Sequence, residues 1–282
     1  MNEESKNRDD DFEHACDVFE REDYKTAYKL FLPLADKGDD AAQVALGHMY
    51  YDGLGVEQDY KQAIKWFRLA AKQGHDAAQD NLGQMYCEGL GVKQDYKKAI
   101  KWYRLAVKQG NGTAQYHLGR MYYQGLGVEK DYKQAVKWYR LAGYKGDADA
   151  KFSMGLFYEG FLRENGEEIP KDYQKAMNWY LLSATQRNAT AQYNLGVMYT
   201  KGLGTPQNYK EALRLFRLSA EQGYAQAQFN LGLMYADGQG VAEDYAEAIK
   251  WLKLAAEQKF EAAQFKLELM HLNQKLGYYL LN

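Results

Sequence analysis

The chain has few residues that stiffen or cross-link a small fold, and no long apolar stretch. It contains three prolines, and its two cysteines, Cys16 and Cys87, show no pairing pattern, so free thiols are expected. No apolar run approaches the roughly 18 residues needed to cross a bilayer. The polar, acidic start MNEESKNRDDDFEHA lacks the apolar core of a secretory signal. A cytoplasmic protein without membrane contact is expected, although a chain trimmed of an export signal would start in the same way.

An excess of positive charge is also missing. Lys and Arg number 36 against 38 Asp and Glu, which gives a formal net charge of −2 at pH 7. General nucleic-acid binding needs many cations to neutralise phosphates, so nucleic acid is not an expected partner. With 46% hydrophobic and 26% charged residues, the composition is that of a folded protein.

What the chain does contain is a segment that returns at a nearly fixed spacing. The segment runs from Ala41 to Asp76 and starts again at Ala77 and at Thr113. The glycine of its central Leu-Gly pair recurs at Gly47, Gly83, Gly119, Gly155, Gly196 and Gly232, at spacings of 36, 36, 36, 41 and 36 residues. A period in this range indicates a solenoid, in which each unit buries its apolar face against its neighbours.

Each unit is predicted to be a helix–turn–helix. In the first unit, apolar residues at i, i+4, i+7 and i+8, from Ala42 to Tyr50, share one face of a helix over 39–52. A Gly-Leu-Gly-Val turn offers two glycines for positive φ, and a second helix then runs to about Gln73. Good N-cap residues precede the second helix of every unit: Asp59, Asp95, Asp131, Asp172, Asn208 and Asp244.

Two recurring residues are interpreted as packing. Gly47 lies in the middle of the first helix, where glycine costs about 1 kcal/mol relative to alanine, so its return predicts close approach of a neighbouring helix. A large apolar residue recurs in the second helix at Trp66, Trp102, Trp138, Trp179, Leu215 and Trp251. Because leucine replaces tryptophan once, the residue at this position is predicted to pack in the core and not to bind a ligand.

These patterns divide the chain into four parts. Residues 1–10 are predicted to be a disordered leader, and 11–38 a capping helix pair that resembles a tetratricopeptide repeat, with Pro33 kinking or ending its second helix. Six repeats span 39–74, 75–110, 111–146, 147–187, 188–223 and 224–258. Residues 259–282 are predicted to form a capping helix and a tail.

The repeat is similar to the Sel1-like repeat family, relatives of tetratricopeptide repeats. The resemblance is seen in Leu46-Gly47, Met49-Tyr50, Gly53 to Val56, Asp59-Tyr60, Ala63, Trp66 and Ala70-Ala71, and it covers residues 39 to 272. It implies an all-α fold, a right-handed α-solenoid superhelix of stacked antiparallel helix pairs. The first helix of each pair (helix A) would line the concave surface and the second (helix B) the convex one. It also implies an adaptor that binds other proteins.

No catalytic or metal-binding pattern accompanies the repeats. The histidines His14, His48, His75, His117 and His271 fall at unrelated repeat positions, without a ligand at metal spacing. The glycine turns lack the Lys-Ser/Thr of a phosphate-binding loop, and no nucleophile elbow occurs. We therefore expect no catalytic residue, no metal and no cofactor.

Function is instead expected on helix A residues that do not repeat. The predicted partner-binding residues of the concave face are His48, Asn81, Gln84, His117, Arg120, Gln124, Asn194 and Asn230. This face is expected to be polar in its N-terminal half and more apolar toward Leu156, Val197 and Leu233. Asn and His can hydrogen-bond an extended peptide, and Arg120 can bind a carboxylate. The alternative is that these are solvated helix residues.

Two other features compete with the concave face. Helix B of the first three repeats is basic, and Lys97, Lys101 and Arg104 form a possible secondary patch for an acidic partner, or a solvated convex face. The fourth repeat holds an insertion over 159–172, with Phe161, Leu162, Glu164, Glu167 and Glu168. Such insertions map to surface loops, which are either functional or merely tolerated.

The sequence thus favours a non-enzymatic scaffold or adaptor that binds a protein or peptide through the concave face. A monomer is expected. One alternative is an immunity or inhibitor protein that blocks a bacterial toxin or enzyme. Another is a β-lactam or cell-wall hydrolase, which the missing catalytic pattern disfavours.

Overall fold

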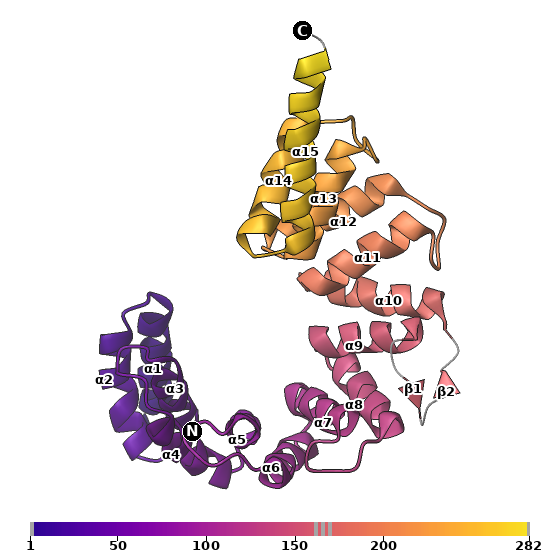
Figure 1. Cartoon of the computed structure of the whole chain (residues 1–282). Coiled ribbons are helices and arrows are strands. Elements are labelled where there is room, and N and C mark those ends of the chain that lie inside the picture. The colour runs from indigo at the N-terminus through magenta and orange to yellow at the C-terminus, as the bar shows by residue number, and fades with distance from the viewer. Residues whose placement is uncertain (1–2, 161–162, 165–166, 169–170, 281–282) are drawn as a thin grey trace. The chain divides into compact units, whose positions relative to one another are not determined.

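The structure, a computed structural model, is built almost entirely of helices (Figure 1). It describes residues 3–160, 163–164, 167–168 and 171–280, and the side chains of residues 10–160 and 171–272. The helices are α1 (Glu3–Glu20), α2 (Tyr24–Asp36), α3 (Asp40–Asp52), α4 (Tyr60–Lys72), α5 (Asp76–Glu88), α6 (Tyr96–Lys108), α7 (Gly112–Gln124), α8 (Tyr132–Tyr144), α9 (Ala148–Glu159), α10 (Tyr173–Ala184), α11 (Ala189–Lys201), α12 (Tyr209–Glu221), α13 (Ala225–Ala236), α14 (Tyr245–Glu257) and α15 (Glu261–Leu280). From α3 onward, odd numbers are A helices and even numbers are B helices.

Capping side chains fix where each B helix begins. The Asp59 carboxylate accepts hydrogen bonds from the backbone N–H groups of Lys61 at 2.8 Å and Gln62 at 3.1 Å. The same capping bond is made at the start of α6, α8, α10, α12 and α14 by Asp95, Asp131, Asp172, Asn208 and Asp244. These bonds satisfy backbone donors that have no partner inside the helix. The predicted N-caps are confirmed.

The repeated glycine lies where helix A meets helix B of its own repeat. A Cβ at Gly47 would lie 2.4 Å from Cε1 of Phe67, whose ring is fully buried in α4. In the other repeats, a Cβ at the same glycine would lie 2.3–2.8 Å from the residue at the same place in helix B, which is Tyr103 for Gly83. The predicted close approach is confirmed.

The repeated tryptophan joins successive repeats. Trp66 packs on the core that α1, α2 and α3 form, and Trp102 packs on the core of α4 and α5. Trp138 packs in the same way on the core of α6 and α7. Full burial of a large apolar side chain contributes about 1.5–3 kcal/mol. These half-buried rings contribute part of that, so this position stabilises the contact between repeats. Its interpretation as packing is confirmed.

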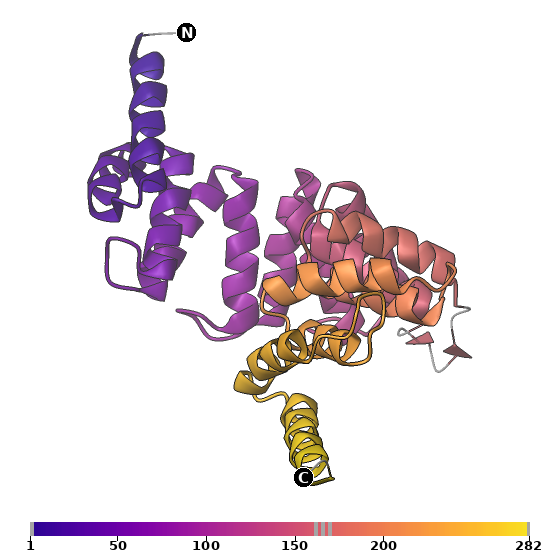
Figure 2. The same ribbon diagram turned by 90° about the horizontal axis from the view of Figure 1, so that it is seen from above.

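The helices group into two compact units, Met1–Ala142 and Gly143–Asn282. Within each unit, helices that follow one another in the chain pack together, for example α3 on α4 and α4 on α5. The result is the all-α solenoid of helix pairs that the period predicts. Figure 2 shows that the first turns of α1 and the last turns of α15 extend beyond the helices on which they pack.

Both ends of the chain are more helical than the sequence predicts. Residues 1–10 are predicted to be disordered, but α1 begins at Glu3. Glu, Lys and Arg, which are frequent in this segment, are good helix formers. At the other end, α15 continues through the predicted tail to Leu280, because Gly277 is the only glycine of the helix and it contains no proline.

Pro33 does not end its helix. The second helix, α2, continues to Asp36, three residues beyond the proline. Proline removes one backbone hydrogen bond of the helix and disfavours the preceding turn. Leu34 and Ala35, which follow it, are buried, and their packing retains the last turn.

The insertion of the fourth repeat contains a short antiparallel hairpin. Its strands are β1 (Arg163–Glu164) and β2 (Glu167–Glu168), with Arg163 opposite Glu168. The side chains of residues 161–170, among them the predicted apolar and acidic residues of the insertion, lie outside the described residues.

Candidate functional site

The predicted partner-binding residues all lie on A helices. In the N-terminal unit they are His48 on α3, Asn81 and Gln84 on α5, and His117, Arg120 and Gln124 on α7. In the C-terminal unit they are Asn194 on α11 and Asn230 on α13. In the structure, some of them contact other side chains of this chain and others are open to solvent.

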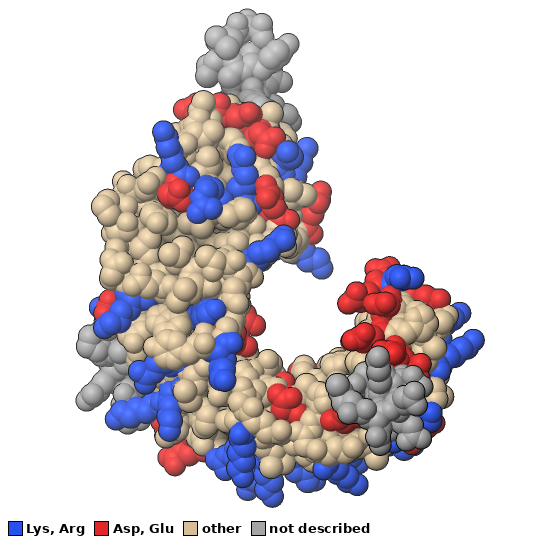
Figure 3. All heavy atoms as spheres, turned by 180° about the vertical axis from the view of Figure 1, so that it is seen from behind, with Lys and Arg blue, Asp and Glu red and all other residues tan. Residues whose placement is uncertain are grey.

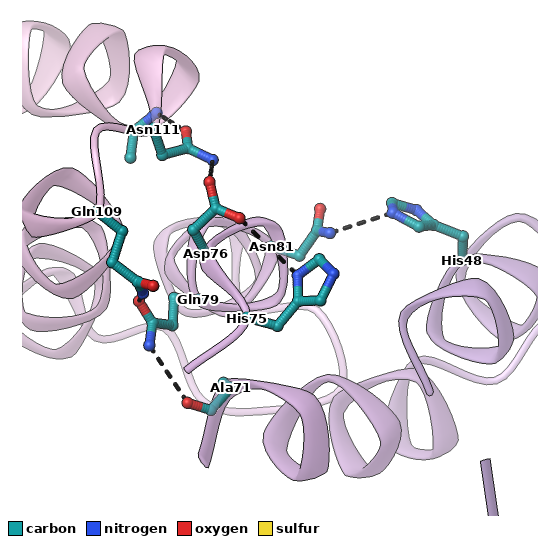
Figure 4. A network of polar contacts seen from close by, with 9 residues as sticks. His48, Ala71, His75, Asp76, Gln79, Asn81, Gln109 and Asn111 are labelled. Carbon is teal, nitrogen blue, oxygen red and sulfur yellow. Dashed lines mark hydrogen bonds and ion pairs between the residues drawn. The ribbon is translucent and has the colours of Figure 1, made fainter. Parts of the chain in front are cut away.

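His48 and Asn81 form a polar contact between two successive A helices. The Asn81 amide nitrogen lies 3.2 Å from Nε2 of His48, as Figure 4 shows. The His48 ring also meets the Phe67 ring edge-on, with the centroids 5.2 Å apart. Both side chains are half-buried. This pair therefore ties α3 to α5, in addition to any contact with a partner.

Burial of His48 makes stability depend on pH. Desolvation lowers its pKa below the ordinary value of 6.5, against a smaller opposite effect of Asp52. The unfolded chain therefore takes up a proton more readily than the folded chain. The stability that His48 contributes is complete above pH 6.5 and is lost as the pH falls from 6.5 through the lower folded value.

We expect His48→Gln to make the urea midpoint less sensitive to acid between about pH 7.5 and 5. Glutamine already occupies the same repeat position at Gln84. The control is His271→Gln, which changes an exposed histidine of α15 and should leave the pH dependence as it is. Equal pH dependence in His48→Gln and the unaltered chain would contradict this prediction.

A second pair, Asp80 with His117, joins α5 to α7. Nδ1 of His117 donates to Oδ1 of Asp80 at 2.9 Å, and Asp80 is only 7% exposed. The His117 ring also lies 4.9 Å from the Tyr103 ring. The sequence prediction missed Asp80. The signal was present, because the same repeat position elsewhere holds only Val44, Tyr116, Phe152, Tyr193 and Phe229.

The remaining polar residues of the N-terminal unit are more open. Gln84 donates to Glu88 at 3.1 Å, one turn along the same helix, whereas Arg120 and Gln124 are exposed. Arg120 and Gln124 line a hollow of about 10 Å³ with Cys87 and His117, which has room for a single water molecule. Burial raises the pKa of the Cys87 thiol despite the opposing charge of Arg120, so this cysteine is not an activated nucleophile.

Asn194 has a structural partner in the C-terminal unit. Its side chain hydrogen-bonds the hydroxyl of Tyr180, and that hydroxyl donates to the Glu159 carboxylate at 2.7 Å. The Tyr180 ring is fully buried, so this chain of bonds fixes α10 between α9 and α11. Asn194 therefore differs from Asn230 in having its polar group engaged within the fold.

Asn230 lines an open groove between α11 and α13. The groove has a volume of about 400 Å³. Its lining residues are Tyr193, Val197, Thr200 and Lys201 of α11, Phe216 of α12, Asn230, Leu233 and Met234 of α13, and Asp237 and Gln239 of the turn that follows α13. Lys201 and Asp237 are exposed charges of opposite sign, and Val197 and Leu233 are half-buried. The groove thus combines an apolar floor with one positive and one negative side chain. Val197 and Leu233, which the sequence analysis places at the apolar end of this face, both line it.

The secondary patch lies on α6. Lys97, Lys101 and Arg104 are exposed. Arg104 donates to the Tyr122 hydroxyl at 3.1 Å, and Arg68 donates to the Tyr86 hydroxyl of the following repeat at 2.8 Å in the same way. The arginine of this patch therefore links successive repeats, whereas the two lysines project from the helix.

No arrangement for a metal ion occurs among the residues that the structure describes. Within that part of the chain, no three His, Cys, Asp or Glu side chains are grouped so as to hold one. Of the helices described, none is both long enough and apolar enough to cross a membrane.

Comparison with solved structures places the fold among repeat proteins. A Sel1 repeat protein from Oxalobacter formigenes is 34% identical over 88% of this chain and 99% of its own, with a TM-score of 0.80. A protective antigen of uropathogenic Escherichia coli with an SLR fold is 38% identical over 86% of this chain, with a TM-score of 0.73, and this chain spans 51% of that protein. An immunity protein from Pseudomonas aeruginosa shares the fold at 18% identity, over 76% of this chain and 81% of its own, with a TM-score of 0.53. No curated protein matches.

The model of the Sel1 repeat matches seven segments of the chain. They are residues 18–39, 40–75, 76–111, 112–147, 148–188, 189–224 and 225–260. Six of them lie on the six predicted repeats, and the first overlaps the helix pair of residues 11–38. The matches cover most of the chain, in agreement with the helix pairs and with the similarity to a solved Sel1 repeat protein. The chain belongs to the Sel1 repeat family.

Proposed function

We propose that this chain is a non-enzymatic interaction module that binds an extended peptide segment of a protein partner in the groove between α11 and α13. Membership of the Sel1 repeat family supports the class of function, because such repeats commonly serve as protein-interaction scaffolds. The observation that supports the place is the groove of about 400 Å³, which presents polar groups beside apolar ones.

The groove has the chemistry of a peptide site. The amide of Asn230 can both donate to and accept from a peptide backbone. Leu233 and Val197 offer apolar contact to one or two side chains of the peptide. Lys201 and Asp237 can pair with charged residues of the peptide that flank those side chains. In the N-terminal unit, by contrast, His48, Asn81 and His117 bind other side chains of this chain, and we assign them a supporting role.

The test is selection of peptides from a random displayed library on the full chain, followed by affinity measurement with fluorescence anisotropy. We expect Leu233→Glu to weaken the selected peptides by about tenfold or more, because it places a charge on the apolar floor. Asn230→Ala should weaken them by about threefold to tenfold through loss of a hydrogen bond.

The matched control is Leu218→Glu, which introduces the same charge at an exposed leucine of helix B in the same unit. We expect it to leave affinity within about twofold. Thermal melting of all variants checks that they remain folded. Peptides that bind Leu233→Glu as tightly as the unaltered chain would place the site elsewhere.

A further inference from the structure

Three successive B helices of the N-terminal unit present one exposed pattern of lysine and leucine. The residues are Lys61, Lys65, Leu69 and Lys72 on α4, Lys97, Lys101, Leu105 and Lys108 on α6, and Lys133, Lys137 and Leu141 on α8. All are exposed, and the leucines are 43%, 41% and 39% exposed. Their spacing of four, four and three residues places each set on one stripe of its helix. We call this surface the leucine–lysine array.

Packing brings the three stripes side by side. Trp102 of α6 packs on the core of α4 and α5, and Trp138 of α8 packs on the core of α6 and α7. α4 and α6 both pack on α5, so their stripes follow one another along the unit. For the step between the leucines we take about 8–10 Å, the usual spacing of neighbouring helices. On α4 and α6, lysines precede and follow the leucine along the helix, so they flank the row of leucines on both sides. Figure 3 shows Lys and Arg side chains gathered along the lower edge of the view.

The charge of the array is specific to the N-terminal unit. The leucine recurs in the C-terminal unit as Leu182, Leu218 and Leu254, which are also exposed. The lysine positions do not recur as a set, because they include Gln174, Asn178, Glu221 and Glu257. Helices α4, α6 and α8 contain no acidic residue, so the stacked lysines of α4 and α6 repel one another. A repeated leucine can be explained by the repeat alone, but this uniform charge needs another reason.

We propose that the leucine–lysine array docks an acidic amphipathic helix of a protein partner, lying across α4, α6 and α8. Charge complementarity selects the occupant, since Asp and Glu on the partner would relieve the repulsion among the lysines. The step between the leucines also sets the spacing of the apolar residues in the partner helix. A helix rises 1.5 Å per residue, so a step of about 10 Å corresponds to roughly seven residues. The partner helix therefore has an apolar residue about every seven positions, flanked by acids.

This surface is separate from the groove between α11 and α13, so the two proposals can fail independently. The test uses two labelled helical peptides of roughly 21 residues. One has leucine at every seventh position with glutamate on both sides, and the other has the same composition with the leucines redistributed around the helix. Fluorescence anisotropy with the full chain at about 0.1 M salt measures their affinities.

We expect the patterned peptide to bind about fivefold or more tightly than the redistributed one. Leu105→Gln and Lys101→Glu should each weaken it by about fivefold or more. The matched controls are Leu254→Gln and Lys250→Glu, which make the same changes at the same repeat positions of α14. These should leave affinity within about twofold, and circular dichroism checks the fold of every variant.

Three results would overturn the proposal. The first is equal binding of the two peptides, or binding that Leu105→Gln leaves intact, because charge attraction alone would then explain it. The second is tighter binding of single-stranded DNA or of vesicles with anionic lipid than of the patterned peptide. The third is self-association of the chain in sedimentation that Lys101→Glu abolishes, because the occupant would then be a second copy.

Discussion

Gly83→Leu is expected to lower the free energy of unfolding of the N-terminal unit by about 3 kcal/mol or more. Even a Cβ at this position would lie 2.4 Å from Cε1 and 2.5 Å from Cδ1 of Tyr103. That ring is 2% exposed, so it cannot turn into solvent to make room. The better helix propensity of leucine returns only about 1 kcal/mol. Urea unfolding followed by circular dichroism measures the loss.

The chain offers a matched control for this substitution. Glu268 occupies the same repeat position in α15, after which no further helix follows in the described residues, and its side chain is exposed. Glu268→Leu should change the free energy of unfolding by no more than about 0.5 kcal/mol. The loss in the free energy of unfolding for Gly83→Ala should lie between those for Glu268→Leu and Gly83→Leu. If Gly83→Leu unfolds at the same urea concentration as the unaltered chain, close packing is not the reason that glycine recurs.

Much of the fold was predictable because a solenoid gives equivalent residues equivalent neighbours. Gly47 recurs since each helix A meets a ring of its own helix B, and Asp59 recurs since each helix B needs a cap. Such roles can be recognised by comparing a chain with itself. The ends lack a neighbour on one side, and there the comparison fails. The sequence therefore missed the extent of α1 and α15.

The candidate site was less predictable because its residues are defined by not repeating. His48 was predicted to face a partner, but it contacts Asn81, 33 residues away on the next A helix. Asp80 was missed, although it is 37 residues from its partner His117, close to one period. Pairs of this kind depend on where two side chains point across neighbouring helices. A search for unusual residues about one repeat apart would have found them.

Only some of the residues that line the groove between α11 and α13 were predicted from the sequence. Asn230 was predicted as a binding residue, and Val197 and Leu233 as the apolar part of the same face. The groove also needs the aromatic floor of Phe216, a residue of helix B that the comparison of A helices does not consider. Asn194 looked equivalent to Asn230, but the hydroxyl of Tyr180 engages it. The sequence predicted which type of side chain lies at these positions. It did not predict whether that side chain is free to bind a partner or is bonded within the fold.

The turn glycine Gly91 gives the second large effect. Its φ is +67°, and a Cβ there would lie 2.5 Å from the carbonyl oxygen of Tyr60, at the start of α4. Gly91→Ala therefore combines a left-handed conformation, which costs about 1–2 kcal/mol for a residue with a Cβ, with a clash against backbone. No side-chain rotation can relieve that clash. We expect a total loss of about 2–4 kcal/mol in the free energy of unfolding.

Gly74→Ala separates the two contributions. Gly74 also has a positive φ, +100°, but a Cβ there would have no atom within 4 Å. This variant should lose only the conformational part, about 1–2 kcal/mol, and urea unfolding of both variants gives the difference. Equal losses would mean that the contact between Gly91 and Tyr60 contributes nothing. A larger loss for Gly91→Ala would mean that the turn before α6 helps to hold the second repeat on the first. The lysines of α4 and α6 would then owe their alignment in the leucine–lysine array partly to that turn.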